Sequence, residues 1–282
     1  MDLSKIYQPR PDSVHKGAYG SVLVIAGSKL YSGSATLAAV SALRSGADLV
    51  TVVAPARAAD VAAHRLTDLI TYSLKGDFLT TGHVRDILDI AHVRRVNSVV
   101  LGPGMGRHRL TISAIYSLIG KVVVPMVLDA DALYAISQKP QVVSGKHLVL
   151  TPHLGELATL LGVEKVNDDL DARMQAAKQA ASKYQAVILL KGHVDIITDG
   201  ASTITNNTGT SFMTKGGFGD TLAGICGALL ARGVGIFEAA HVAAYINGKA
   251  GEMAAYHAGE GVLASDIFGY IPRVIQGERR EG

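Results

Sequence analysis

Short apolar stretches rich in β-branched residues alternate along the chain with longer stretches of helical pattern. The apolar stretches are typical of strands buried on both faces, and their alternation with helices indicates a mostly parallel sheet covered on both sides. The sequence therefore predicts the α/β class, with three layers in the order α/β/α. The predicted strands are Ser21–Ala26, Leu49–Val53, Leu69–Ser73, Ser98–Leu101, Val122–Leu128, Leu148–Leu150 and Val187–Leu190. The predicted helices lie near Ala35–Ser45, Arg57–His64, His83–Ala91, Leu110–Ile119, Ala130–Ser137, Gly155–Leu161 and Leu170–Tyr184.

The C-terminal third of the chain shows a different pattern. Val194–Thr198 and Ser202–Asn206 flank Asp199-Gly200, a dipeptide that favours a two-residue turn in a β-hairpin. No linker rich in proline or serine separates this part from the rest, so we expect a single domain over residues 1–282. Three further helices are predicted, at about Asp220–Arg232, Ile236–His257 and Ser265–Ile275.

Composition and charge exclude several classes of protein. The chain is 48% hydrophobic, which is enough for one sizeable core, and its net charge is only +3. No run of Lys and Arg exceeds two residues, so nothing indicates nucleic acid or an anionic membrane as a partner. The single cysteine, Cys226, lies in an apolar helix and is interpreted as a buried hydrophobic residue. With no secretory signal and no apolar stretch of about 20 residues, the sequence predicts a cytoplasmic protein.

A glycine-rich turn that opens an apolar helix is the strongest candidate for chemistry. Gly216, Gly217 and Gly219 precede or flank Asp220, and the apolar stretch Thr221–Leu230 follows. Glycines allow a tight turn, and the unpaired amides at the start of the helix attract an anion. Asp220 alone is explained equally well as a carboxylate that stabilises a helix start. If a phosphate binds the amides, however, Asp220 is placed to take the proton of an attacking hydroxyl.

Other motifs for nucleotides or metals are weak. The Gly-Lys pairs that begin at Gly120, Gly145 and Gly248 lack the upstream glycine of a P-loop, and Gly27 is not followed by a dinucleotide fingerprint. The ten histidines show no ligand spacing, so no protein-held metal site is predicted. Asp129 and Asp131 flank a helix start; we expect one to cap that helix and the other to help orient the phosphate region.

The turn before Asp220, late in an α/β chain, resembles that of ribokinase-like kinases. Further segments narrow the resemblance to the NAD(P)H-hydrate dehydratase family, in family order over about residues 15 to 266. The Pro-His-x-Gly-Glu stretch that ends at Glu156 is the most distinctive of them. In chain order the segments are His15–Gly17, Gly20–Ser28, Tyr31–Ala35, Ala42–Ala47, Gly102–Gly106, Leu128–Leu133, Thr151–Glu156 and Lys191–Asp195.

The resemblance implies a ribokinase-like fold and a repair reaction. Reduced nicotinamide cofactors occasionally add water at the C5–C6 double bond, and enzymes of this family reverse the damage in the S epimer of NAD(P)H hydrate. They phosphorylate the added hydroxyl with ADP in most bacterial and archaeal members, or with ATP in eukaryotic ones, and phosphate then leaves. Mg²⁺, held largely by phosphates and water, is the expected cofactor.

Roles carried over from the family fall on five segments. Asp220 is expected to be the catalytic base and to contact the hydrate, and the amides of Gly217, Phe218 and Gly219 to bind phosphate. The stretch Lys191, Gly192, His193, Val194 and Asp195 is expected to hold the nucleotide, with Lys191 offering a charge to phosphate. The hydrate is expected to contact Gly104, Gly106, His153 and a small residue after Gly33, for which Ser34 and Ala35 compete.

Several of these residues also have plain structural explanations. On burial trends alone, His153 is more often a neighbour of a helix cap or a residue at the edge of the core. Glu156 fits a capping box better than a Mg²⁺ contact. Gly104 and Gly106 equally suit a simple turn, and a lysine that ends a strand, such as Lys191, is ordinarily solvated.

Two residues depart from the family pattern. Lys215 and Phe218 replace the usual small or hydroxyl residues; Lys215 could add a cation near the phosphate, and Phe218 could stack on or crowd a ring. The epimerase domain often fused to such enzymes is expected to be absent, and small-residue helices favour a homo-oligomer, with a tetramer as one candidate. The alternatives are a ribokinase-like kinase for a vitamin-precursor alcohol and a nucleotide-sensing protein without turnover.

Overall fold

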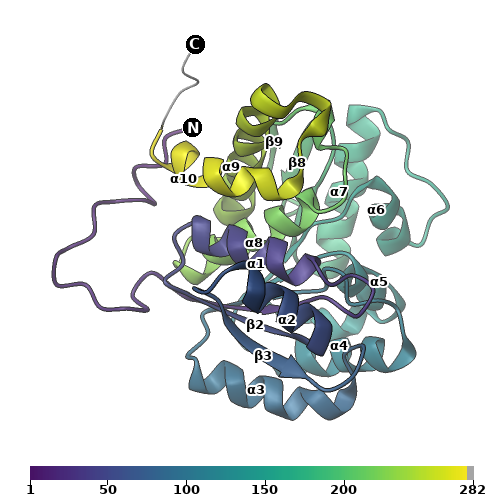
Figure 1. Cartoon of the computed structure of the whole chain (residues 1–282). Helices are drawn as coiled ribbons and strands as arrows, with labels where there is room; N and C mark the ends of the chain where they lie inside the picture. Colours follow the sequence, from purple (N-terminus) through teal and green to yellow (C-terminus); the bar gives the residue numbers. More distant parts are fainter. Residues whose placement is uncertain (278–282) are drawn as a thin grey trace.

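The structure, a computed structural model, describes residues 1–277 and is built around one sheet of nine strands (Figure 1). The strand order is β3-β2-β1-β4-β5-β6-β7-β8-β9, and all neighbours up to β7 are parallel. The strands β8 and β9 add an antiparallel hairpin at one edge. The strand bounds are β1 Ser21–Ile25, β2 Leu49–Pro55, β3 Ile70–Leu74, β4 Ser98–Leu101, β5 Met126–Leu128, β6 Leu148–Leu150, β7 Val187–Leu190, β8 Asp195–Thr198 and β9 Thr203–Asn206.

Helices cover both faces of this sheet, which confirms the predicted three layers. Side chains alternate between the faces of a strand, so Val22 and Val24 of β1 enter one core while Leu23 and Ile25 enter the other. The first core is covered by α1 (Ser34–Arg44), α2 (Ala56–Arg65), α8 (Phe218–Ala231), α9 (Ile236–Ala258) and α10 (Tyr270–Ile275). The second is covered by α3 (Val84–Val93), α4 (Arg109–Lys121), α5 (Asp131–Gln138), α6 (Leu154–Leu161) and α7 (Leu170–Tyr184).

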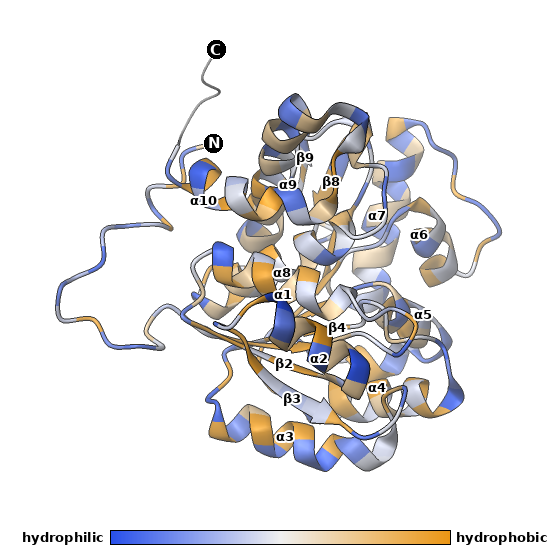
Figure 2. Ribbon diagram, in the orientation of Figure 1, coloured by the Kyte–Doolittle hydropathy of each residue, from blue (hydrophilic) through white to orange (hydrophobic). Residues whose placement is uncertain are grey.

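Hydropathy follows these layers. The central strands are mostly hydrophobic, whereas outer helices such as α3 also carry hydrophilic residues (Figure 2). Cys226 is buried in α8 as predicted, and burial raises the pKa of its thiol. Within residues 1–277, no helix is both long and apolar enough to cross a membrane. The single-domain prediction covers residues 1–282, of which 278–282 lie outside the described residues.

Three predicted elements differ from the structure. The hairpin forms, but its loop comprises residues 199–202 because the Asp199 carboxylate accepts bonds from the amides of Ala201 and Ser202. β5 is shorter than the predicted Val122–Leu128 and begins only after Pro125, whose ring nitrogen cannot donate to a neighbouring strand. The last predicted helix is split into a 3₁₀ helix, η5 (Ala264–Gly269), and the short α10.

The small residues of α8 pack inside the chain. A Cβ added at Gly224 would lie 2.0 Å from the carbonyl oxygen of Ala38 in α1, and one added at Gly227 would lie 2.4 Å from Cγ2 of Val100 in β4. The helix therefore lies against α1 on one side and the sheet on the other. Its small residues serve this close approach, so they do not support the expected homo-oligomer, which stays a prediction.

The strand order brings distant segments to one edge of the sheet. β1, β4, β5, β6 and β7 run parallel, so the segments that follow their carboxyl ends lie along the same edge. From β1 the chain continues to β2 and β3 on one side, whereas β4 lies on the other side. The loops after β1 and β4 therefore lead in opposite directions from this point of the sheet edge. Open α/β sheets bind ligands at such a point.

Candidate active site

Asp129, Glu156 and Lys191 form a charged cluster at this edge of the sheet. Asp129 follows β5 and is 2% exposed; it accepts hydrogen bonds from Oγ1 of Thr151 at 2.7 Å and from Nζ of Lys191 at 2.9 Å. Nζ of Lys191 also lies 3.7 Å from Oε2 of Glu156. Burial lowers the pKa of Lys191, but Asp129, Glu156 and Asp220 outweigh it and leave the pKa above its ordinary value. Lys191 is therefore a fixed cation and not the ordinary solvated lysine that a strand end allows.

Asp220 joins this cluster from the first turn of α8. Burial raises its pKa to about 7, and the nearby Asp129 carboxylate adds to the rise. The Ser34 hydroxyl and the Lys191 ammonium act in the opposite direction, because both favour the ionised form. Gly219 makes the approach close: a Cβ there would lie 3.3 Å from Nζ of Lys191 and 3.8 Å from Oδ2 of Asp129. Asp220 is thus poised to bind or release a proton near neutral pH.

The glycine turn before Asp220 has the backbone of an anion site. Gly217 precedes the helix with φ +104°, a value that favours glycine, and a Cβ there would lie 2.7 Å from Cδ1 of Leu37. The amide of Thr221 donates to the carbonyl of Gly217 and so begins the helical hydrogen bonds. The amides of Phe218 and Gly219 precede that first bond and are available to a ligand.

Phe218 does not offer its ring to a ligand. Its side chain is 5% exposed and packs in the core shared by α1, α8 and α9. Its carbonyl accepts hydrogen bonds from Oγ1 of Thr221 and Nδ2 of Asn247, and these bonds fix the backbone of the turn. The interpretation of Phe218 as a residue that stacks on or crowds a ligand ring is wrong, because its own ring is buried in the core.

Lys215 is also used differently from the expectation. Its ammonium donates to the carbonyl of Glu260 and, at 3.1 Å, to that of Val262. These carbonyls belong to the 3₁₀ turn η4 (Gly259–Gly261) and the residue that follows it. Lys215 therefore ties the glycine turn to the segment after α9, and its charge is directed to that segment instead of a phosphate.

The loop after β4 reaches the start of α1. Gly104 has φ +62°, and a Cβ there would lie 2.6 Å from Oγ of Ser34. The Ser34 hydroxyl lies near enough to Asp220 to favour its ionised form, so this side chain connects the loop to the carboxylate. Ala35, its competitor in the sequence, is fully buried, so Ser34 is the residue that lies at the site. The amide of Gly106 donates to Oδ2 of Asp131 at 2.7 Å.

The expected cap of α5 by an aspartate is wrong. Asp129 is engaged by Thr151 and Lys191, whereas Asp131 accepts from Gly106 and lies 3.2 Å from Nε of Arg107. Ala130 occupies the N-cap position with φ +50°. Both carboxylates therefore bind residues of neighbouring segments at the sheet edge and do not cap α5.

His153 and Glu156 form the capping box of α6, which confirms the structural role predicted for Glu156. Nδ1 of His153 accepts from the amides of Gly155 and Glu156, and the His153 amide donates to Oε2 of Glu156 at 2.8 Å. His153 is itself the N-cap residue, and 62% of its side chain is exposed. Nε2, the other ring nitrogen, lies 3.6 Å from Oε2 of Glu156.

The turn between β7 and β8 is held partly by residues that the sequence did not single out. The amide of Gly192 donates to Oδ1 of Asp195 at 3.0 Å, and Nδ2 of Asn206 donates to Oδ2 at 2.9 Å. Burial raises the pKa of Asp195, although both hydrogen bonds favour its ionised form. Arg173 of α7 bonds the carbonyl of Val194. Asn206 and Arg173 follow no motif, and only the fold brings them here.

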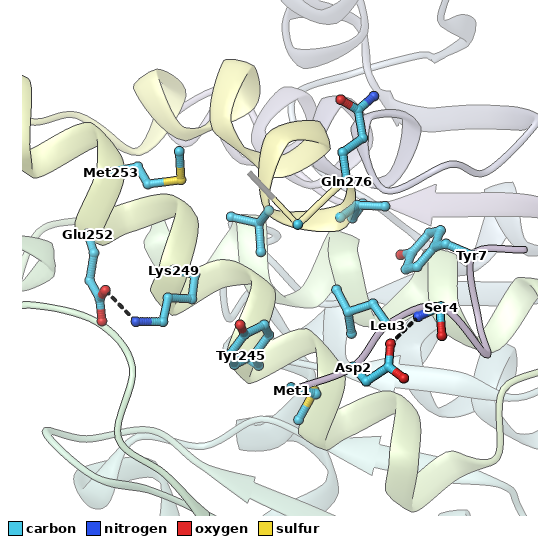
Figure 3. A pocket seen from close by; sticks show the side chains of 13 residues that line it. Met1, Asp2, Leu3, Ser4, Tyr7, Tyr245, Lys249, Glu252, Met253 and Gln276 are labelled. Atoms are coloured by element: carbon cyan, nitrogen blue, oxygen red, sulfur yellow. Dashed lines mark hydrogen bonds and ion pairs between the residues drawn. The ribbon is translucent and has the colours of Figure 1, made fainter. Parts of the chain in front are cut away.

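A sizeable cavity lies elsewhere in the molecule. It has a volume of about 960 Å³ and is bounded by the N-terminal segment, α9 and α10 (Figure 3). Lys249 and Glu252 on its wall already pair with each other at 2.8 Å. None of the predicted site residues lines this cavity. The charged cluster at the sheet edge, with its titratable acid, is therefore the better candidate for chemistry.

A magnesium ion brought by a nucleotide fits the donors of this site. Residues 1–277 contain no group of three or more His, Cys, Asp or Glu side chains placed to hold a metal ion alone. Two carboxylates, Asp129 and Glu156, nevertheless flank Lys191, and oxygen donors are the ligands that Mg²⁺ prefers. The donor set suits an ion that keeps most of its phosphate and water ligands.

Comparisons with known proteins agree on one family. A family model described as NAD(P)H-hydrate dehydratase matches residues 22–273. The bifunctional NAD(P)H-hydrate repair enzyme Nnr of Pyrobaculum aerophilum is 42% identical over 95% of this chain and 52% of that protein. The ADP-dependent (S)-NAD(P)H-hydrate dehydratase of Cenarchaeum symbiosum is 34% identical, over 98% of this chain and 95% of the other.

A solved structure confirms the predicted ribokinase-like fold. The ADP/ATP-dependent NAD(P)H-hydrate dehydratase of Bacillus subtilis, co-crystallised with ATP/Mg²⁺, superposes with a TM-score of 0.81 at 26% identity. The match covers 98% of this chain and 95% of the Bacillus subtilis chain. The present chain spans about half the length of the bifunctional relatives it matches. Sequence, fold and site thus lead to one conclusion: the chain belongs to the NAD(P)H-hydrate dehydratase family.

Proposed function

We propose that the protein restores NAD(P)H from the S epimer of its hydrate, with ADP as the phosphoryl donor. The observation that carries this proposal is Asp220, a proton acceptor poised near neutral pH beside Lys191 at the start of α8. The family and the name of the Cenarchaeum symbiosum relative supply the substrate and the donor. ATP is the alternative donor, as the name of the Bacillus subtilis protein indicates for that enzyme.

In the first step, Asp220 takes the proton of the hydroxyl at C6 of the hydrate. The hydroxyl oxygen forms a bond to the terminal phosphorus of ADP, and the bond from that phosphorus to the bridging oxygen breaks, which releases AMP. The transferred group carries negative charge, which the amides of Gly217, Phe218 and Gly219 and the ammonium of Lys191 stabilise. Lys191 is suited to this because its carboxylate partners already hold it in place.

In the second step, the ring nitrogen of the phosphorylated intermediate supplies electrons and the C6–oxygen bond breaks. Phosphate leaves with that electron pair, and loss of a proton from C5 restores the double bond. The sum is hydrate plus ADP giving NAD(P)H, AMP and phosphate. Mg²⁺ bound to the nucleotide would neutralise phosphate charge, with Glu156 and Asp129 the carboxylates nearest to Lys191.

The hydrate and the nucleotide are assigned to different parts of the sheet edge. Ser34, Gly104, Gly106 and the Nε2 face of His153 would contact the hydrate, with Ser34 also holding Asp220. The turn that starts at Lys191 and ends at Asp195 would hold the nucleotide. With this division the reacting oxygen would lie between Asp220 and the transferred phosphate, as in-line transfer requires.

The test is to incubate the purified protein with NADH hydrate and either ADP or ATP and to record the recovery of dihydronicotinamide absorbance. Recovery with ADP is the expected result. Absence of recovery with both donors would overturn the proposal. Phosphorylation of a vitamin-precursor alcohol instead would favour a kinase, and nucleotide binding without turnover would favour a sensor. Light scattering on the same sample measures the predicted homo-oligomer.

A further inference from the structure

Arg173 is a buried charge that the proposed reaction does not use. It lies on α7, and only 1% of the residue is exposed. Burying a guanidinium is costly unless its donors are satisfied. Oδ1 of Asp168 lies 3.8 Å from Nε of Arg173, but this side chain is 75% exposed and gives little compensation. The Asp195 carboxylate also interacts electrostatically with Arg173. An aliphatic side chain would fill this space in the core without that cost.

The guanidinium of Arg173 is directed at the turn between β7 and β8. Nη2 donates to the carbonyl of Val194 at 2.7 Å, and Nη1 lies 3.4 Å from Nδ1 of His193. A Cβ added at Gly192 would lie 2.0 Å from Nη2, so the guanidinium rests directly on the backbone of this glycine. Arg173 thus contacts three successive residues of the turn.

Other residues hold the same turn through its backbone amides. The Lys191 amide donates to the carbonyl of Pro152 at 2.8 Å, and the Gly192 amide donates to Asp195. Donors of the turn are therefore taken by Pro152 and Asp195, whereas its acceptor at Val194 is taken by Arg173. The four residues between β7 and β8 are fixed at both ends, although a short exposed turn with a glycine would otherwise be mobile.

Arg173 also affects the state of His193. A guanidinium has only donors, so Nδ1 of His193 can hydrogen-bond Nη1 only as an acceptor. This contact favours the tautomer that carries hydrogen on Nε2. A defined donor on an exposed ring is useful for recognising an acceptor atom of a bound nucleotide.

We propose that Arg173 is a positioning residue that fixes the Gly192–Val194 turn and the Nε2–H tautomer of His193 for nucleotide binding. The inference rests on the proposed function only in assigning the nucleotide to this turn. Arg173 itself does not touch the nucleotide; it acts through the backbone of Gly192 and Val194 and through the His193 ring.

The experiment compares Arg173→Met with Arg232→Met as a matched control. Arg232 also bonds two backbone carbonyls, those of Gly46 and Ile6, at 3.0 Å each, but it packs against Tyr7 and Tyr19 away from the turn. Calorimetric titration with ADP should give a Kd about 10- to 100-fold weaker for Arg173→Met, the loss expected for hydrogen bonds to a charged group. Arg232→Met should bind ADP like the wild type even where its Tm falls by a similar amount.

Two further measurements separate positioning from folding. KM for ADP should rise in Arg173→Met while kcat and KM for the hydrate change by less than about threefold. ¹⁵N NMR of the His193 ring should show Nε2–H in the wild type and a mixture of tautomers in the variant. If Arg173→Met does not fold, Arg173→Lys replaces it, because lysine keeps the charge but cannot contact Val194 and His193 together.

The inference is overturned if Arg173→Met binds ADP as tightly as Arg232→Met, or if wild-type His193 carries its proton on Nδ1. It is also overturned if the wild type binds no adenine nucleotide. ADP binding and the NMR signal need no turnover, so a protein that binds ADP but does not repair the hydrate would contradict the proposed function while leaving this inference intact.

Discussion

Nζ of Lys191 lies 2.9 Å from Oδ1 of Asp129, although 62 positions separate the two residues in the chain. Asp129 follows β5 and Lys191 follows β7, and the parallel pairing of β5, β6 and β7 brings the two strand ends together. The pair lies beside Asp220 and acts on it with opposite signs. Asp129 raises the pKa of Asp220, whereas Lys191 lowers it.

Removing the two partners should therefore shift the pH dependence of activity in opposite directions. A base must be ionised to act, so the wild-type rate should fall about tenfold per pH unit below the Asp220 pKa of about 7. Asp129→Asn should move this limb to lower pH and Lys191→Met to higher pH. The measurement is kcat/KM for the hydrate as a function of pH. Shifts in the same direction would contradict the electrostatic account.

Asp220→Asn should stabilise the protein at neutral and alkaline pH. The pKa of Asp220 is about 7 when folded and near 3.8 when unfolded, so the folded state binds the proton more tightly. Its contribution to stability is fully present below about pH 4 and is lost as the pH rises through 7. Above that pH the variant should be more stable by up to about 4 kcal/mol. Urea denaturation at pH 4.5 and pH 8 tests this, and an equal difference at both pH values would contradict it.

Lys215→Met should loosen the glycine turn without removing a group from the site. Lys215 holds the carbonyls of Glu260 and Val262, so its loss frees the turn that carries the anion-binding amides. We expect kcat to fall about tenfold while KM for the hydrate changes little. Lys29→Met, which breaks an exposed pair with Asp77, is the control. Unchanged kcat in Lys215→Met would show that the tie matters only for stability.

Gly104→Ala and Gly106→Ala form a matched pair. Both glycines have positive φ, so alanine is strained at each, but only at Gly104 would its Cβ meet Oγ of Ser34 and Cβ of Tyr31. Displacing Ser34 disturbs its interaction with Asp220, so Gly104→Ala should lose at least about tenfold more in kcat/KM than Gly106→Ala. Equal losses would mean that backbone strain, and not the contact with Ser34, sets the effect.

The layers of the fold could be predicted because each strand is a short apolar stretch that must be buried on both faces. The exact ends of the strands could not be predicted, because they depend on single hydrogen bonds and on proline, which hydropathy does not describe. Asp199 extends the hairpin loop by accepting two amide hydrogen bonds, and Pro125 delays the start of β5. The small residues of α8 suggested contact between subunits, but they allow α8 to approach Ala38 and Val100 within the chain.

The position of a candidate-site residue could be predicted where a motif places it at a strand end or a helix start, as for Asp220 and Lys191. The direction in which each side chain points could not be predicted from a motif. Phe218 and Lys215 stand in the same turn, yet the ring enters the core and the ammonium reaches the segment after α9. Arg173 was missed because a charged residue in a polar helix predicts exposure, and only the packing of α7 on the turn after β7 buries it.

The most direct test of the central claim is the stoichiometry of the reaction with ADP. Wild-type protein, NADH hydrate and limiting ADP should yield one AMP and one phosphate for each NADH recovered, followed by ³¹P NMR and absorbance. Asp220→Asn should yield none of the three while still binding ADP in a calorimetric titration. Recovery of NADH by Asp220→Asn, or recovery by the wild type without AMP, would contradict the account.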